Sequence, residues 1–306
     1  MQYLREPGYD LELRQALFKY LGQLVEASSD GLVSSKEANE FHFGNEKIPI
    51  IVQAGIRKPK QLDAALAIRT TYTPPGKPAP YQDSNDSTGL ILYKYRGYDP
   101  NHSDNRAMRA AIEPRVPLVY FVGISSGRYL PIYPVYVEGE NPIKLEFLIS
   151  VGGRAEEFSE LLDPAFPRRY SVQEARVRLH QPVFRARVID AYQSACAMCH
   201  LRHQELLDAA HILPDTHPKG QPIVSNGIAL CKLHHAAFDR NFIGIRPDYS
   251  MAVKRRLIKE KDGPMLLHGI QEMDGKVLAV PRSAEARPDR NRLDERFQEF
   301  LERSES

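Results

Sequence analysis

The stretch Leu230–Asp239, LCKLHHAAFD, decides how the second half of the chain is built, because it places two histidines, His234 and His235, directly after a cysteine pattern. Two short pairs, Cys-x2-Cys and Cys-x2-His, are separated by 31 residues. Pairs with this spacing bring four side chains around one tetrahedral ion, and three thiolates with one imidazole are a common structural zinc set. The predicted Zn²⁺ ligands are Cys196, Cys199, Cys231 and His234.

A second interpretation of the first pair is haem attachment, because CAMCH at 196–200 has the c-type pattern. That chemistry needs export, and the N-terminal segment MQYLREPGYDLELRQ is charged and lacks the apolar core of a signal peptide. It would also leave the Cys231 pair without a role. The odd number of cysteines favours a reducing compartment, and no apolar run approaches the roughly 18 residues of a membrane span.

The second histidine points to a different site on the same segment. His235 and Asp239 are four residues apart, so on a helix they share a face and can hold one Mg²⁺-like ion. Upstream, His211 ends a β-like run in LLDAAHILPD, and Asn226 lies five residues before Cys231. Histidine has a pKa near neutrality and suits the role of a general base in phosphodiester hydrolysis.

The order and spacing over about residues 190–245 resemble the HNH endonucleases, whose ββα-metal core is a hairpin followed by a helix. The resemblance implies that His211 is the base and that Asn226 orients it or braces the loop. It implies that His235 and Asp239 hold Mg²⁺ or Mn²⁺, and that the products carry 5′-phosphates. Many relatives place a further ligand directly before the base, where this chain has Ala210.

Asp208 is the candidate substitute for that missing ligand, because it lies two residues before Ala210 on the same strand face. The alternative is a charge at a strand edge. His200, His203 and His217 are interpreted as surface or loop residues. The alternative for His211 is a structural histidine, and the alternative for the whole segment is a binding-only HNH domain.

The first 165 residues alternate between helical and β-rich patterns. A helix is predicted over 10–28 and a short one over 104–113, and strands over 89–99, 117–124 and 128–139. Their centre is expected to be a curved sheet or β-barrel. The segment PYQDSNDSTGLILYKYRG at 80–97 resembles, more weakly, the SET-and-RING-associated (SRA) domain, a PUA-like barrel that flips a modified cytosine out of DNA.

The SRA resemblance implies a pocket in which tyrosines stack on the flipped base and a carboxylate accepts from cytosine N4. The candidate pocket residues are Tyr81, Asp83, Asp86, Tyr93 and Tyr95, with Asp83 and Asp86 as alternatives for reading the base. The alternative for the last two tyrosines is an ordinary core role. Seven basic residues are candidate contacts to DNA phosphates, and the alternative for each is an ordinary solvated charge. They are Arg57, Lys58, Lys60, Lys94, Arg96, Arg106 and Arg109.

The predicted fold is therefore α+β, with an SRA/PUA-like domain at 1–165, a helical linker at 166–188 that prolines interrupt, and an HNH domain with structural zinc at 189–306. The basic segment VKRRLIKEK at 253–261 either follows a DNA backbone or is a solvated strand edge.

The combination of reader and nuclease resembles the modification-dependent, type IV-like restriction endonucleases of bacteria. It implies cleavage of double-stranded DNA that carries 5-methyl- or 5-hydroxymethylcytosine, by a cytoplasmic protein that acts at the nucleoid. One HNH site cuts one strand, so a homodimer fits a double-strand break. Two alternatives are an HNH nuclease that acts on unmodified DNA through another reader, and a zinc-stabilised DNA-binding protein without catalysis.

Overall fold

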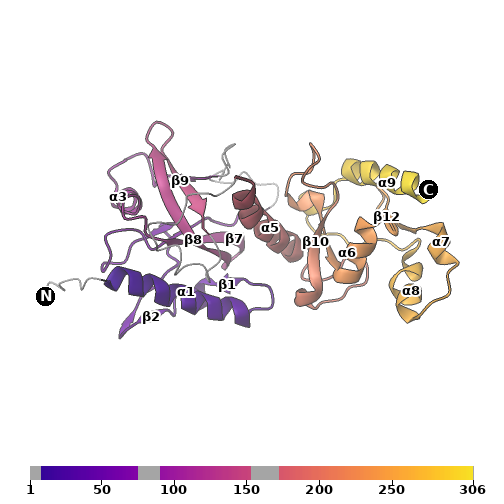
Figure 1. Cartoon of the computed structure of the whole chain (residues 1–306), viewed down its shortest axis with the longest axis horizontal. Helices are drawn as coiled ribbons and strands as arrows, with labels where there is room; N and C mark the ends of the chain where they lie inside the picture. The colour runs from indigo at the N-terminus through magenta and orange to yellow at the C-terminus, as the bar shows by residue number, and fades with distance from the viewer. Residues whose placement is uncertain (1–7, 75–89, 153–171, 306) are drawn as a thin grey trace. The chain divides into compact units, whose positions relative to one another are not determined.

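The computed structural model describes residues 8–74, 90–152 and 172–305, and the chain divides into two units, Met1–His180 and Gln181–Ser306. Both contain helices and strands, which confirms the α+β prediction (Figure 1). Within the described residues, no helix is long and apolar enough to cross a membrane.

The N-terminal unit contains one sheet, a small β2–β3 hairpin and three helices among its described elements before α5. The helices are α1 (Tyr9–Ala27), α2 (Ser35–Ala38) and α3 (Ser103–Arg109). The strands are β1 (Val33–Ser34), β2 (His42–Phe43), β3 (Glu46–Lys47), β4 (Ile56–Arg57), β5 (Ala67–Arg69), β6 (Ile91–Lys94), β7 (Leu118–Ser125), β8 (Arg128–Asn141) and β9 (Glu146–Val151).

The sheet has seven strands in the order β4-β5-β7-β8-β9-β6, with β1 added beside β8. Only β5 and β7 pair in parallel, and register shifts along β8 bend the sheet. The bend brings the two outer strands of this order, β4 and β6, toward each other, and Tyr93 on β6 bridges them. Its hydroxyl lies 3.1 Å from the Arg69 carbonyl oxygen and 3.3 Å from that of Gly55, beside β4. The predicted barrel is therefore a curled half-barrel among the described residues.

Helix α1 covers one side of this sheet, and α3 lies on the other side (Figure 1). Apolar side chains recur along α1 at helical spacing and are buried with residues of β7 and β8. Arg14 on the same helix is fully buried, and its guanidinium donates to the carbonyl oxygens of Ala65 and Pro117 at 3.0 and 2.7 Å. A buried arginine with such partners ties α1 to two loops of the unit.

The C-terminal unit is assembled from two hairpins and short helices. Its strands are β10 (Leu207–His211), β11 (Gly227–Cys231), β12 (Ile243–Ile245) and β13 (Met251–Val253). Its α-helices, after α5 (Val172–Ala191), are α6 (Lys232–Asp239), α7 (Arg255–Ile258), α8 (Pro264–Gly269) and α9 (Arg290–Glu305). Four 3-10 turns, Gln204–Leu206, Val224–Asn226, Gln271–Met273 and Ala284–Ala286, complete its described elements.

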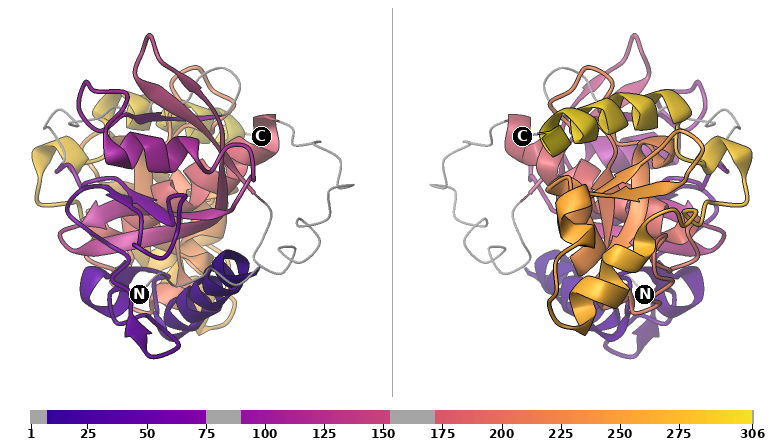
Figure 2. Two further views of the ribbon diagram at one scale, coloured as in Figure 1. Left: turned by 90° about the vertical axis from the view of Figure 1, so that its left-hand side faces the viewer. Right: turned by 90° about the vertical axis from the view of Figure 1, so that its right-hand side faces the viewer.

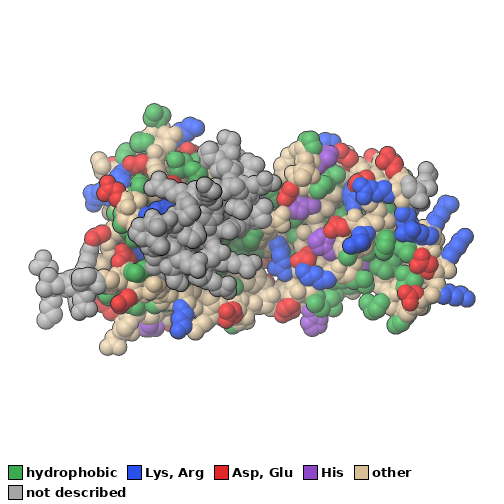
Figure 3. Space-filling model, viewed as in Figure 1, with side chains coloured by type: hydrophobic (Ala, Val, Ile, Leu, Met, Phe, Trp, Pro, Cys, Tyr) green, Lys and Arg blue, Asp and Glu red, His purple; other side chains and the backbone are tan. Residues whose placement is uncertain are grey.

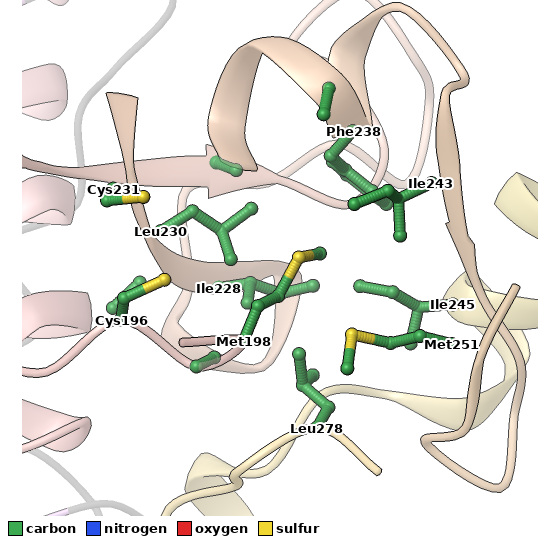
Figure 4. Packing of buried hydrophobic residues seen from close by; sticks show 14 of the residues in the cluster. Cys196, Met198, Ile228, Leu230, Cys231, Phe238, Ile243, Ile245, Met251 and Leu278 are labelled. Atoms are coloured by element: carbon green, nitrogen blue, oxygen red, sulfur yellow. The ribbon is translucent and has the colours of Figure 1, made fainter. Parts of the chain in front are cut away.

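One apolar cluster joins both hairpins to α6 and to the second half of α5. Figure 4 shows its residues on β11, α6, β12 and β13 packed together. Phe184 and Val188 of α5 pack against the start of β11 so closely that only glycine fits at position 227. A Cβ there would lie 2.4 Å from Val188 and 2.8 Å from Phe184. The hairpin that carries His211 is thereby seated directly on α5, because His211 pairs with Gly227 in its register.

Two local predictions differ from the structure. Pro182 lies inside α5 and does not end it, whereas Pro164 and Pro167 lie outside the described residues. Packing of the turns after Pro182 into the C-terminal core outweighs the local cost of the proline. The basic segment at 253–261 leaves β13 and forms the short helix α7, so it is not a strand edge.

Candidate active site and metal centre

A tight knuckle brings the first two cysteines together. The Cys196 amide donates to the Leu201 carbonyl, and the His200 amide donates to the Cys196 carbonyl, both at 2.9 Å. His200 closes this turn with a positive φ of 62°. The turn directs the Cys196 and Cys199 side chains to the same point, as a Cys-x2-Cys pair requires.

The second pair lies at the junction of β11 and α6. Cys231 is the residue before α6, and its sulfur lies 3.1 Å from Nδ1 of His234, one turn into the helix. Figure 4 shows Cys196 and Cys231 side by side at the edge of the apolar cluster. The donor atoms of all four predicted ligands lie within 4.8 Å of one another. Tetrahedral zinc–sulfur bonds of 2.3 Å place sulfurs about 3.8 Å apart, so the set fits one zinc ion.

Hydrogen bonds to and among these four side chains set their orientation and their protonation. His234 is buried, and its Nε2 lies 2.7 Å from the Gly269 carbonyl oxygen, which leaves Nδ1 to face the sulfurs. Burial opposes a charge on His234, but hydrogen bonds with the Cys196 and Cys231 sulfurs outweigh it and raise its pKa to about 10. Hydrogen bonds from Cys199 and Cys231 lower the pKa of the Cys196 thiol. These contacts favour thiolate at Cys196, the form that binds metal, whereas hydrogen bonds with Cys196 and Cys231 raise the pKa of the Cys199 thiol. The cluster contains all three cysteines, which leaves none for haem attachment.

His211 lies at the end of β10, and its ring stacks on Phe184 with centroids 4.1 Å apart and an interplanar angle of 18°. The Asp215 carboxylate lies 3.0 Å from Nε2, but not in line for a hydrogen bond, and Nε2 is a buried atom without a hydrogen-bond partner among the described residues. Burial lowers the pKa of His211, against the opposing charge of Asp215. The lowered pKa favours the neutral ring, and its Nε2 forms no hydrogen bond with the described residues.

Asn226 braces the loop that follows His211. Its carboxamide is fully buried, accepts from the Leu213 amide at 3.0 Å, and donates to the carbonyl oxygens of Leu213 and Gln221 at 2.9 and 3.1 Å. These three bonds close the 212–226 loop. Of the two roles expected for Asn226, they correspond to bracing the loop.

The third histidine lies between two carboxylates. His235 Nε2 is 3.3 Å from Asp239 Oδ2 on the same face of α6, and its Nδ1 is 3.5 Å from Asp208 Oδ2 on β10. Asp208 is also paired with Lys232 at 2.5 Å and with Arg185 at 3.5 Å. Burial opposes the charge of Asp208, but the hydrogen bond and charge of Lys232 outweigh it and lower its pKa. Asp208, His235 and Asp239 therefore meet at one place, with the charges of His235 and Asp239 also acting on His211.

The zinc set is the only cluster of three or more His, Cys, Asp or Glu side chains with metal-binding spacing that the described residues contain. Asp208, His235 and Asp239 do not form such a closed cluster.

The predicted base pocket is described only in part, because Tyr81, Asp83 and Asp86 lie outside the described residues. Tyr93 and Tyr95 are buried. The Tyr95 ring stacks on Phe147 at 4.5 Å, and its hydroxyl donates to Glu140. Together with the bonds of Tyr93 across the half-barrel, these contacts favour the core role for both tyrosines.

Most of the candidate phosphate contacts have partners inside the protein. Arg109 binds Glu140 through two nitrogens at 2.8 Å. Carboxylate or carbonyl partners of the others are found for Arg57, Lys58, Lys60, Lys94 and Arg96. Arg106 is exposed, with no such partner among the described residues.

Several residues of the site were not predicted from the sequence. Phe184, which stacks on His211, and Arg185, which pairs with Asp208, come from α5 and carry no local signal. Asp215 could have been found, because it lies four residues after His211, and Lys232 because it begins the helix of the motif.

Residues 196–246 match the family described as HNH endonuclease. The C-terminal unit therefore carries an HNH endonuclease domain. A search of curated protein sequences gave no match.

Two solved structures are similar to the chain at low identity. One is the modification-dependent TagI restriction endonuclease, with 17% identity, 81% of this chain and 85% of that chain covered, and a TM-score of 0.28. The other is the type IV phosphorothioation-dependent restriction endonuclease ScoMcrA, with 15% identity, 67% and 54% covered, and a TM-score of 0.26.

Proposed function

We propose that this protein is a DNA endonuclease that hydrolyses phosphodiester bonds at the β10–β11–α6 site, with His211 as the general base. The observation that carries the proposal is the Nε2 of His211, which lies 3.0 Å from the Asp215 carboxylate without a hydrogen bond and is next to the charges of His235 and Asp239. A neutral imidazole with a free acceptor nitrogen can take a proton from water. Attack of that water on phosphorus forms one P–O bond and breaks the bond to the 3′ oxygen, which takes a proton from solvent and leaves a 5′-phosphate.

The donor set beside His211 suits a Mg²⁺ or Mn²⁺ ion. His235 Nε2 and Asp239 Oδ2 are 3.3 Å apart on one helix face, close to the separation of two neighbouring ligands around one ion. Such an ion, when bound, polarises the scissile phosphate and neutralises charge on the leaving oxygen. His235 and Asp239 would hold it.

Asp208 fits a different role from the one expected for it. It faces Nδ1 of His235, the nitrogen opposite the one that faces Asp239. A carboxylate on the far nitrogen fixes the tautomer and the orientation of a metal-binding imidazole. We therefore assign Asp208 to orienting His235, held in turn by Lys232 and Arg185.

For the substrate, we propose double-stranded DNA with 5-methyl- or 5-hydroxymethylcytosine, read by the N-terminal unit through base flipping. The support is the resemblance of residues 80–97 to SRA domains. Because the contacts of Tyr93 and Tyr95 favour a core role, Tyr81 with Asp83 or Asp86 are the main candidates for the base pocket. A homodimer with one cut per strand remains part of the proposal.

Cleavage of a panel of duplexes tests these proposals. Unmodified, methylated, hydroxymethylated and glucosylated DNA are incubated with the full chain and Mg²⁺ or Mn²⁺. We expect cleavage of methylated or hydroxymethylated duplexes by the parent and by the control His268→Ala, which removes an exposed histidine of the same unit, and none by His211→Ala.

Each alternative gives a different result. Equal cutting of modified and unmodified DNA would refute the modified-cytosine proposal and favour a nuclease with another reader. Binding without cleavage of every duplex, by parent and variants alike, would refute the enzyme and favour a zinc-stabilised DNA-binding protein.

A further inference from the structure

The C-terminal helix α9 lies outside the segment that matches the HNH family, yet one of its faces contacts two parts of the candidate active site. Figure 2 shows α9 running across the C-terminal unit, and it packs against β12. Arg292 and Arg296 are four residues apart and therefore share this face. They reach opposite sides of the site.

Arg292 holds the loop that connects His211 with Asn226. Its Nε donates to the Lys219 carbonyl at 3.1 Å, and its terminal nitrogens donate to the Gln221 side chain at 3.0 Å and to the Ser225 hydroxyl at 3.4 Å. Glu295, on the next turn, pairs with His217 and Lys219, each at 3.0 Å. The start of α9 adds a backbone bond of 2.9 Å from Asp289 to Ser225. The loop between His211 and Asn226 is thus attached to α9 at several points.

Arg296 holds the end of α6, where the candidate ligand Asp239 lies. Its guanidinium donates to the carbonyl oxygens of Phe238 at 3.0 Å and of Asp239 at 3.4 Å, and its carbon lies 5.0 Å from the centre of the Phe238 ring. Only 11% of the side chain is exposed. A cation at a helix C-terminus satisfies carbonyls that have no partner within the helix and interacts favourably with its dipole.

We propose that α9 acts as a clasp that fixes the position of His211 relative to Asp239, with Arg292 and Arg296 as positioning residues. The proposal rests on the proposed function, because it takes His211 as the base and Asp239 as a ligand of the catalytic ion. Catalytic groups lose efficiency when they move by as little as about 1 Å, so a helix that ties both elements together affects rate without touching substrate.

Hydrogen–deuterium exchange of the zinc-loaded full chain tests the clasp without relying on activity. Arg292→Gln should speed exchange of the amides of Gly220 and Asn226 in the loop, and Arg296→Gln that of the amides 240–242 after α6. Arg303→Gln is the matched control, since it removes the same charge from α9 and breaks only an exposed pair with Glu299. Exchange that is unchanged in both loops, or equal in all three variants, would overturn the proposal.

Single-turnover cleavage then shows whether the clasp serves catalysis. We expect Arg296→Gln to raise the Mg²⁺ concentration for half-maximal rate about tenfold, and Arg292→Gln to lower the rate at saturating Mg²⁺ about tenfold, each equal to about 1.4 kcal/mol. Arg296→Lys, which keeps the charge, should recover part of the loss.

The outcomes separate the two proposals. If exchange changes as expected but rate and Mg²⁺ dependence per folded molecule do not, the clasp is structural only and the positioning role is wrong. If the parent cuts no duplex, the proposed function is wrong, and exchange alone still decides whether α9 holds the two elements.

Discussion

Replacing His234 or His235 with alanine should give opposite phenotypes, although the two residues are adjacent. His234 is buried and belongs to the zinc set, whereas His235 is partly exposed and lies between Asp208 and Asp239. His234→Ala should lose zinc and strongly destabilise the C-terminal unit. His235→Ala should keep zinc, fold and DNA binding, and lose cleavage.

The expected energies differ enough to measure. A structural zinc contributes about 10–16 kcal/mol of binding free energy, so losing one ligand of four removes about 3 kcal/mol. Losing the buried hydrogen bond to Gly269 adds about 1–3 kcal/mol. The sum, about 4–6 kcal/mol, is comparable to the whole stability of many domains. The partly exposed ion pairs of His235 contribute at most about 1 kcal/mol.

Thermal unfolding and zinc analysis measure this difference. At about 4 °C per kcal/mol for a unit of this size, the melting temperature should fall by about 16–24 °C in His234→Ala and by about 4 °C or less in His235→Ala. Zinc should be near one ion per chain in the parent and in His235→Ala only. Equal zinc content and equal melting temperatures in the two variants would refute the division of the pair between two sites.

Three further substitutions test the surroundings of the site and the half-barrel. Asn226→Ala removes two buried hydrogen bonds and one partly buried one. It should lower the free energy of unfolding, measured in urea, by about 2–4 kcal/mol, whereas an unchanged midpoint would contradict its bracing role. Gly227→Ala places a methyl group against Phe184, so it should lower the free energy of unfolding by about 1–3 kcal/mol and slow cleavage. A fully active, equally stable variant would disprove the close packing. Hydrogen bonds from Arg109 lower the pKa of Glu140 below its ordinary 4.5, so ionised Glu140 stabilises the fold above that pH and the contribution disappears as pH falls through the lowered pKa. Glu140→Gln should therefore be less stable than the parent at pH 7 and approach it in acid, and a pH-independent difference would count against the pair.

The parts of the site that could be predicted from the sequence are those set by local geometry. The x2 spacing of the ligand pairs and the four-residue spacing from His235 to Asp239 fix which side chains meet, whatever surrounds them. Roles that depend on distant segments were not accessible. The stacking of Phe184 on His211 and the position of Asp208 on the Nδ1 side of His235 arise only when α5 and the hairpin pack together.

The fold shows the same limit. Alternating apolar residues predict strands in the first 150 residues, but the closure of the half-barrel depends on one hydroxyl, that of Tyr93, reaching carbonyls more than twenty residues away. A proline signals a helix break by local rules, yet Pro182 lies within α5 because the following residues are buried in the C-terminal core.

Helix α6 carries one proposed ligand of each metal, His234 and His235, on consecutive positions, and this has a consequence for how metal dependence is measured. A strong chelator such as EDTA would remove zinc from His234 as well as any ion from His235, so loss of cleavage after chelation reports on both sites at once. If Mg²⁺ alone restores cleavage after chelation, the chelator removed only the catalytic ion. If Zn²⁺ is needed as well, the chelator also removed the zinc and the Cys/His site lost its structure. Metal preference should therefore be measured by adding ions back to protein whose zinc content has been determined.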